Sequence, residues 1–136
     1  MSRFGSCTVV VEGNAVKHVN DFLLPLCGRK SDEYVCGICF NVQSKLVDDV
    51  LYVHFEFNWD LDILDKICEI CESESGRFYY NYSDESMPWG SESNDEEEKY
   101  FTKHEGYWNP ECDFVYYYEP KFDFFNTMPD PIEYRI

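Results

Sequence analysis

The most regular pattern of hydrophobic and polar positions lies between residues 61 and 76. Apolar side chains recur there at steps of three and four residues: Leu61, Leu64, Ile67, Cys68 and Cys71. The positions between them are charged: Asp62, Asp65, Lys66, Glu69 and Glu72. This division into two faces predicts an amphipathic helix, and Gly76 is placed to end it.

A shorter helix is predicted near the N-terminus. Its apolar positions follow the same three- and four-residue steps: Ala15, Val16, Val19, Phe22 and Leu23. Asn14 precedes them as a candidate N-cap, and Pro25 stops the pattern.

Four segments have the composition and periodicity of strands: residues 7–12, 34–40, 51–57 and 77–82. In the third segment, apolar residues alternate with Tyr52, His54 and Glu56, which predicts a sheet with one covered face. The elements follow in the order strand, helix, strand, strand, helix, strand. That order predicts an α+β fold, a ferredoxin-like βαββαβ two-layer sandwich over residues 5–82, with both helices on one face of the sheet. The other face is left for solvent, an appended element or a partner.

The rest of the chain divides into two parts. Residues 83–98 are mainly serine, asparagine and acidic residues, which predicts an acidic loop. Residues 99–136 predict an extended, β-rich C-terminal extension, with a hairpin around Glu105-Gly106 or Asn109-Pro110 and an irregular tail from Pro120 onward. We expect residues 1–136 to form a single domain.

The acidic residues are concentrated in one part of the chain, which predicts an acidic region on the surface of this fold. The chain has 11 basic and 27 acidic residues, a formal net charge of −16. Residues 60–98 hold 13 of the acidic and 2 of the basic residues, so most of the excess lies on the second helix and the acidic loop. Because phosphate binding needs clustered lysine and arginine, the charge argues against nucleic acid and an anionic membrane as direct ligands. With 44% hydrophobic and 18% aromatic residues, the chain is too apolar for a disordered class.

Targeting signals and cysteine usage indicate a compartment. The first residues lack the apolar core of a signal peptide, and no apolar run approaches the roughly 20 residues of a membrane span. The seven cysteines lack the regular spacing of a secreted disulfide scaffold. We therefore expect reduced thiols and a location in the cytoplasm, that of a host cell if the protein is phage-encoded.

Two C-x-x-C pairs have a spacing that suits zinc: Cys36 with Cys39, and Cys68 with Cys71. The second pair continues the apolar face of the predicted helix, where cysteine packs as a small hydrophobe. The first lies in a predicted strand, which would direct its two thiols to opposite faces of the sheet. The 28 residues between the pairs also exceed the usual gap of paired zinc knuckles. Core packing is favoured, so we expect no metal and no cofactor, and zinc or thiol chemistry at these four cysteines is the alternative.

Positive signs of enzyme chemistry are missing from the sequence. His18, His54 and His104 stand singly, and there is no glycine-rich phosphate loop and no nucleophile elbow. We expect a protein that is not an enzyme. A small hydrolase with converging carboxylates is a further hypothesis, for which a deep acidic pocket would be the sign.

Acidic residues beside exposed aromatic rings would suit a basic partner, because rings contribute contact energy and charge speeds and orients the encounter. An acidic surface can also imitate the phosphates of a nucleic acid. The predicted partner-binding residues are Asp62, Asp65, Glu69, Glu72, Trp89, Asp95, Glu96, Glu97 and Glu98. In the alternative interpretation, this charge serves solubility alone and the chain is an acidic housekeeping domain.

The stretch from Tyr52 to Asp60, followed by a helix and then Phe78-Tyr79-Tyr80-Asn81-Tyr82, resembles the central part of a known family. This family comprises small phage- and plasmid-encoded proteins with a ferredoxin-like domain, the YubB type. The resemblance implies an origin in a mobile element, where small acidic proteins often inhibit host defence systems. We therefore expect an inhibitor that occupies a basic, nucleic-acid-binding surface of a host defence protein such as a CRISPR complex.

Overall fold

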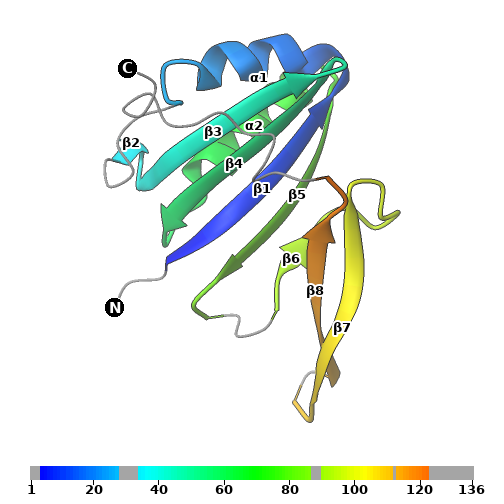
Figure 1. The fold of residues 1–136 in the computed structure, drawn as a ribbon. Helices are drawn as coiled ribbons and strands as arrows, with labels where there is room; N and C mark the ends of the chain where they lie inside the picture. The colour runs from blue at the N-terminus through cyan, green and yellow to red at the C-terminus, as the bar shows by residue number, and fades with distance from the viewer. Residues whose placement is uncertain (1–3, 28–33, 87–89, 112, 123–136) are drawn as a thin grey trace.

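A computed structural model describes residues 4–27, 34–86, 90–111 and 113–122. The elements follow the chain as β1 (Phe4–Glu12), a 3₁₀ turn (Gly13–Ala15), α1 (Val16–Leu23), β2 (Tyr34–Cys36), β3 (Cys39–Val47), β4 (Val50–Asn58), α2 (Asp62–Ser73), β5 (Arg77–Asp84), β6 (Glu92–Ser93), β7 (Phe101–Asn109) and β8 (Asp113–Pro120). The fold is mixed α+β. A six-stranded antiparallel sheet has the order β2-β3-β4-β1-β5-β6, and β7 and β8 form a separate two-stranded sheet (Figure 1).

The first strand lies at the centre of the sheet, between β4 and β5. Its run of valines is inaccessible to solvent, and Val9, Val10 and Val11 are each 0% exposed. Burial on both faces suits the β-branched run, which packs well on a pleated surface. The sheet therefore has two covered faces at this strand, and a different set of elements covers each.

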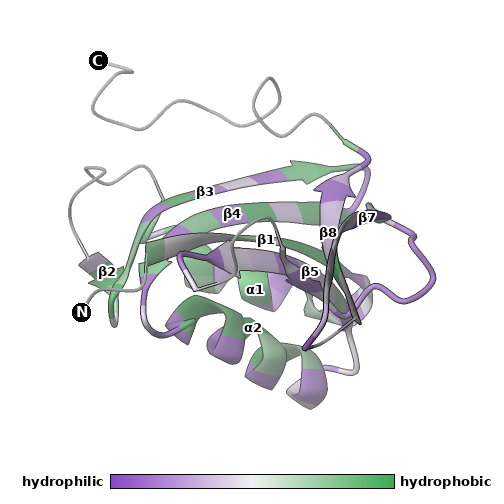
Figure 2. Ribbon diagram, turned by 90° about the horizontal axis from the view of Figure 1, so that it is seen from below, coloured by the Kyte–Doolittle hydropathy of each residue, from purple (hydrophilic) through white to green (hydrophobic). Residues whose placement is uncertain are grey.

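Helices α1 and α2 lie together on one face of the sheet (Figure 2). The apolar face of α2 supplies Ile63 and Ile67, and α1 supplies Val19 and Leu23, all fully buried. These side chains belong to one core with the alternate residues of β1 and β4 that face the helices. The apolar residues at helical spacing and those that alternate along the strands thus pack against each other in one apolar layer.

The predicted strand over residues 34–40 is in fact a hairpin, because a two-residue turn at Gly37 and Ile38 divides it into β2 and β3. Gly37 has a φ of +57°, which glycine adopts at little cost, and a Cβ there would lie 2.1 Å from the Asp62 carboxylate. The Ile38 N–H donates to that carboxylate at 3.2 Å. The turn is therefore held by a residue at the start of α2.

The other face of the sheet is covered at one end by the C-terminal extension. Tyr100 packs edge-on against Tyr52, with ring centroids 6.3 Å apart, and Phe122 lies 4.5 Å from the same ring. Glu12 anchors the extension, since its side chain accepts the Tyr100 hydroxyl and pairs with the Lys99 ammonium at 2.7 Å. Burial alone would raise the pKa of Glu12, but these two partners and the charge of Arg77 outweigh it and lower the pKa below its usual value.

Beyond the predicted four strands, β2 and β6 extend the sheet at its two edges. The predicted acidic loop contributes its first residues to β5 and residues 92–93 to β6. The C-terminal hairpin turns after Asn109, which pairs with Asp113, and so follows the second of the two predicted turns. Residues 123–136, which include most of the predicted irregular tail, lie outside the described residues. Within the described chain, no helix combines the length and apolarity that a membrane crossing requires.

Candidate interaction surface

The outward face of α2 carries three exposed carboxylates, Asp65, Glu69 and Glu72. Asp65 and Glu72 are seven residues apart in this helix, so a rise of about 1.5 Å per residue spreads the three along roughly 10 Å. Burial raises the pKa of Asp65, and so do the charges of Asp62 and Asp60. The negative charge is thus densest near the start of α2.

Asp62 differs from these three acids, because its side chain stabilises the β2–β3 turn and is not fully exposed. It is half-buried, its carboxylate accepts the Ile38 N–H, and it packs against the glycine of the β2–β3 turn. A carboxylate in the first turn of a helix also interacts favourably with the helix dipole. Of the four acids predicted on α2, three are exposed, and Asp62 is already engaged.

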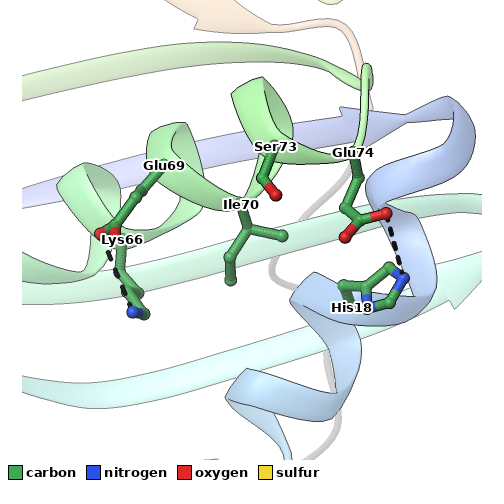
Figure 3. Close-up of a pocket in the computed structure, with 6 residues that line it drawn as sticks. All are labelled: His18, Lys66, Glu69, Ile70, Ser73 and Glu74. Carbon is green, nitrogen blue, oxygen red and sulfur yellow. Dashed lines mark ion pairs between the residues drawn. The ribbon is translucent and has the colours of Figure 1, made fainter.

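Lys66 of α2 and His18 of α1 line an open hollow of about 310 Å³ between the two helices (Figure 3). Lys66 approaches Glu69 at 3.8 Å, and His18 approaches Glu74 at 3.4 Å. Both pairs are substantially exposed, so each contributes little to stability. Lys66 offsets part of the negative charge on the side of α2 that faces α1.

The acidic run 95–98 does not act as one exposed group. Asp95 is 1% exposed, and its carboxylate accepts the backbone N–H groups of Lys99, Tyr100 and Phe101 at 3.0, 2.8 and 2.9 Å. The expectation that Asp95 lies in water and contacts a partner therefore needs correction. The residue is buried because three backbone donors converge on it, and it shapes the turn that leads into β7.

The other three acids of this run differ from one another. Glu96 and Glu97 are exposed, whereas Glu98 is half-buried and accepts the Lys103 N–H at 2.7 Å. The turn lies at the end of the sheet where α2 finishes, because Lys99 pairs with Glu12, and Glu12 lies opposite Arg77 at the start of β5. Lys99 and Tyr100 attach this turn to the face of the sheet away from the helices, so its contacts do not bring Glu96 and Glu97 together with the acids of α2. Trp89, the predicted aromatic contact of this loop, lies outside the described residues.

A row of three stacked rings on β5 was missed in the sequence. The rings of Phe78 and Tyr80 stack with their centroids 6.3 Å apart and an angle of 19° between their planes. For Tyr80 and Tyr82, the centroids are 5.8 Å apart and the angle is 27°. All three are half-buried and pack at the margin of the helix-covered core. The signal was present, since every second residue of the predicted strand 77–82 is aromatic and side chains two apart share a face.

Carboxylates flank this row. The Tyr82 hydroxyl donates to Glu92 on β6 at 2.5 Å, and this bond adds to burial in raising the pKa of the tyrosine. Burial also raises the pKa of Tyr80, followed by the charges of Glu92, Cys7 and Cys68, which belong to β6, β1 and α2. We call these rings, Glu92 and the three exposed acids of α2 together the acidic–aromatic surface. It consists of Asp65, Glu69, Glu72, Phe78, Tyr80, Tyr82 and Glu92.

Asn94 closes the backbone edge of β5 beside this surface. Its carboxamide oxygen accepts the Tyr80 N–H at 2.7 Å, and its amide nitrogen donates to the Phe78 carbonyl at 3.1 Å. One side chain thus replaces the pairing of a neighbouring strand, which protects an exposed edge from further strands. The surface therefore presents side chains, not an unpaired backbone edge, at this position.

The four cysteines of the C-x-x-C pairs do not converge. Cys36 and Cys39 lie directly opposite each other across the β2–β3 turn, so they share a face and do not point to opposite faces as the predicted strand required. Cys39 and Cys71 are buried, Cys36 and Cys68 half-buried, and all four are free thiols. Burial raises the pKa of each, for Cys39 and Cys71 to about 11. Protonated thiols are poor nucleophiles and poor ligands. Within the described residues, no three of histidine, cysteine, aspartate and glutamate are placed to share a metal ion.

Comparison of the chain with protein-family models, with curated proteins and with solved structures gave no match.

Proposed function

We propose that the protein is a non-enzymatic binding protein whose acidic–aromatic surface binds a basic surface of another protein. The observation that supports this most is the row of Phe78, Tyr80 and Tyr82, half-buried beside Glu92 of β6 and near Cys68 of α2, whose thiol donates to Glu72. Stacked rings offer flat apolar area and attract the guanidinium groups of arginine. The surrounding acids steer a basic partner and discourage an acidic one.

The best candidate for the partner is a nucleic-acid-binding groove, because such grooves concentrate arginine and lysine. A host defence nuclease, such as a CRISPR complex, is the first target to test. The resemblance around residues 51–82 supports this choice through the mobile-element origin it implies, and a ferredoxin-like layout is part of the same proposal. Four strands in the order β3-β4-β1-β5, with both helices on one face, support that layout.

The test measures the dissociation constant of the protein with a purified CRISPR effector complex at about 50 and 300 mM salt. Reversing two charges on opposite borders of the rings, with Glu72→Lys and Glu92→Lys together, should weaken binding at least about tenfold, which is roughly 1.4 kcal/mol. Higher salt should weaken the wild-type complex as well, because exposed charges are then screened.

The matched control is Glu105→Lys combined with Glu119→Lys, which changes the net charge equally at two exposed positions of the β7–β8 hairpin. It should change the affinity by no more than about twofold to threefold, since distant exposed charges act only through the overall field. A complex that withstands salt and both double variants equally, or no complex at all, would contradict the proposed function.

A further inference from the structure

A second groove lies on the face of the sheet away from the helices, at the end that the C-terminal extension leaves open within the described chain. It has a volume of about 520 Å³ and spans β1, β3, β4 and β5. Its lining residues are Phe4, Gly5, Ser6, Phe40, Glu56, Ser83, Asp84 and Glu85. We call it the sheet-end groove. It shares no residue with the acidic–aromatic surface.

Aromatic rings form the apolar part of this groove. Phe4 and Phe40 meet edge to face with ring centroids 6.5 Å apart, and Tyr34 meets Phe40 in the same way at 5.7 Å. Phe4 is 41% exposed and Tyr34 49% exposed, so the cluster is open to solvent. Three rings from three strands thus present an accessible apolar surface, and aromatic residues of this kind supply much of the energy of protein interfaces.

Carboxylates form the polar part. Glu56 is half-buried next to the rings, and Asn41 donates to its Oε2 at 2.7 Å, which fixes the side chain. Asp84 and Glu85 lie across β1 from it, where the Glu85 N–H donates to the Phe4 carbonyl at 3.0 Å. Gly5 lies between the two sides, where a Cβ would come within 2.2 Å of the Ser83 carbonyl. The lining therefore joins three acids and two phenyl rings and includes no lysine, arginine or histidine.

We infer that the sheet-end groove binds an arginine-bearing extended segment of a basic partner protein. A guanidinium group is planar, so it can stack on Phe4 or Phe40 while its N–H groups donate to Glu56 on one side and to Glu85 on the other. A lysine ammonium is a compact charge without a flat face, so it cannot stack on a ring in this way. The combination of flat rings and separated carboxylates therefore favours arginine over lysine.

A second copy of this chain is a poor occupant, since it would bring another net charge of −16 to a groove lined by acids. Like charges across an interface oppose association, whereas a cationic segment is attracted. The inference goes beyond the proposed function because it concerns the opposite face of the sheet. Either surface could fail its test without the other.

The experiment is an NMR titration of the uniformly ¹⁵N-labelled full chain with three synthetic peptides. Each peptide has three cationic or isosteric positions separated by single glycines: arginine in the first, lysine in the second and uncharged citrulline in the third. We expect the arginine peptide to give saturable shifts at the amides of Ser6, Phe40, Glu56 and Glu85. The lysine peptide should bind at least about fivefold more weakly, and citrulline should give no saturable shifts.

Two single variants test the groove, because one substitution alone could weaken binding by disturbing the fold. Phe4→Ser removes an exposed ring, and Glu85→Gln removes an exposed charge while keeping the size of the side chain. Each should weaken arginine-peptide binding at least about threefold, whereas the exposed control Glu105→Gln should leave it unchanged. The spectrum of each variant shows whether it is folded.

Three outcomes would overturn the inference. They are shifts confined to the amides of α2 and of residues 78–82, equal affinity for the arginine and lysine peptides, and groove signals that change with protein concentration in the absence of peptide. The last would identify a second copy as the occupant. The first would locate cation binding on the acidic–aromatic surface and leave the proposed function standing.

Discussion

Replacing Asp95 with alanine should destabilise the turn that leads into β7. The substitution removes both acceptor oxygens, Oδ1 from the Lys99 N–H and Oδ2 from the N–H groups of Tyr100 and Phe101. A hydrogen bond to a charged group contributes about 1.5–3 kcal/mol. Water can replace the bond at exposed Lys99, but it reaches the other two amides poorly because Tyr100 is half-buried and Phe101 fully buried. Two unreplaced bonds at the lower value give a loss of about 3 kcal/mol.

Urea unfolding followed by circular dichroism measures this loss. With a slope of about 2 kcal/mol per molar urea, the midpoint of Asp95→Ala should fall by about 1.5 M. Asp95→Asn should lie between this variant and the wild type, because one amide oxygen can still accept the Tyr100 and Phe101 N–H groups. Glu97→Ala, at an exposed position two residues away, should change the free energy of unfolding by less than about 0.5 kcal/mol.

Hydrogen exchange locates the effect. The amides of Tyr100 and Phe101 should lose protection in Asp95→Ala, and the amides of β4 should follow only as far as global stability falls. Equal midpoints for Asp95→Ala and Glu97→Ala, with unchanged exchange at Tyr100 and Phe101, would refute the assignment of a structural role to this carboxylate.

Three further predictions concern single side chains. Asn94→Ala should speed exchange of the Tyr80 amide and cost about 1–2 kcal/mol, because it removes both bonds to the edge of β5, and an unchanged exchange rate would count against this closure. Glu12 has a pKa lowered from 4.5, so the stability it contributes is complete above that value and is lost as pH falls through the lower folded-state pKa. The difference in unfolding free energy between Glu12→Gln and the wild type should therefore shrink in acid, and a constant difference would contradict the anchor. Burial lowers the pKa of His54 from 6.5, although the charge of Glu56 acts in the opposite direction. The unfolded chain therefore binds the proton more readily than the folded one, and the free energy of unfolding falls below about pH 6.5. His54→Gln should flatten that part of the profile of unfolding free energy against pH.

The elements that the sequence predicts well are those in which local pattern and tertiary packing agree. In α2, the apolar spacing that predicts the helix also lists the residues that reach the core, such as Ile67. In β4, the alternation of residues 51–57 identifies directly the face that packs against the helices, with Phe55 and Phe57 buried. Periodicity is sufficient there, because a single apolar layer sets both the element and its orientation.

The β2–β3 hairpin could not be predicted in the same way. Residues 34–40 are continuously apolar apart from one glycine, and a continuous run is typical of a buried strand. What turns the chain is Asp62, 24 residues after Ile38, whose carboxylate accepts the Ile38 N–H. A bond between residues so distant in sequence leaves no local signal, which is why the pattern of residues 34–40 predicts one strand with Cys36 and Cys39 on opposite faces.

The acidic run 95–98 shows the same limit at the candidate site. The sequence gives no reason to distinguish the four consecutive acids, and each is expected to be exposed. In the structure, the carboxylate of Asp95 is buried against three backbone N–H groups, whereas Glu96 and Glu97 are exposed to water. Conversely, the alternation of Phe78, Tyr80 and Tyr82 was visible, and only the position of Glu92 beside the row required the structure.

This division among the acids gives folding and partner binding opposite responses to salt. Asp95 and Asp62 accept backbone hydrogen bonds at short range, which salt screens little, whereas the exposed acids repel one another through solvent over distances near the Debye length of about 10 Å at 0.1 M. With a net charge of −16, that repulsion opposes the compact state, so raising sodium chloride from about 20 to 300 mM should raise the midpoint of thermal unfolding. The same increase should weaken a complex formed through Asp65, Glu69 and Glu72. A midpoint that falls with salt would show that attractive ion pairs such as Glu12–Lys99 outweigh the repulsion, and the exposed acids would then contribute less to the surface potential than the proposed partner binding requires.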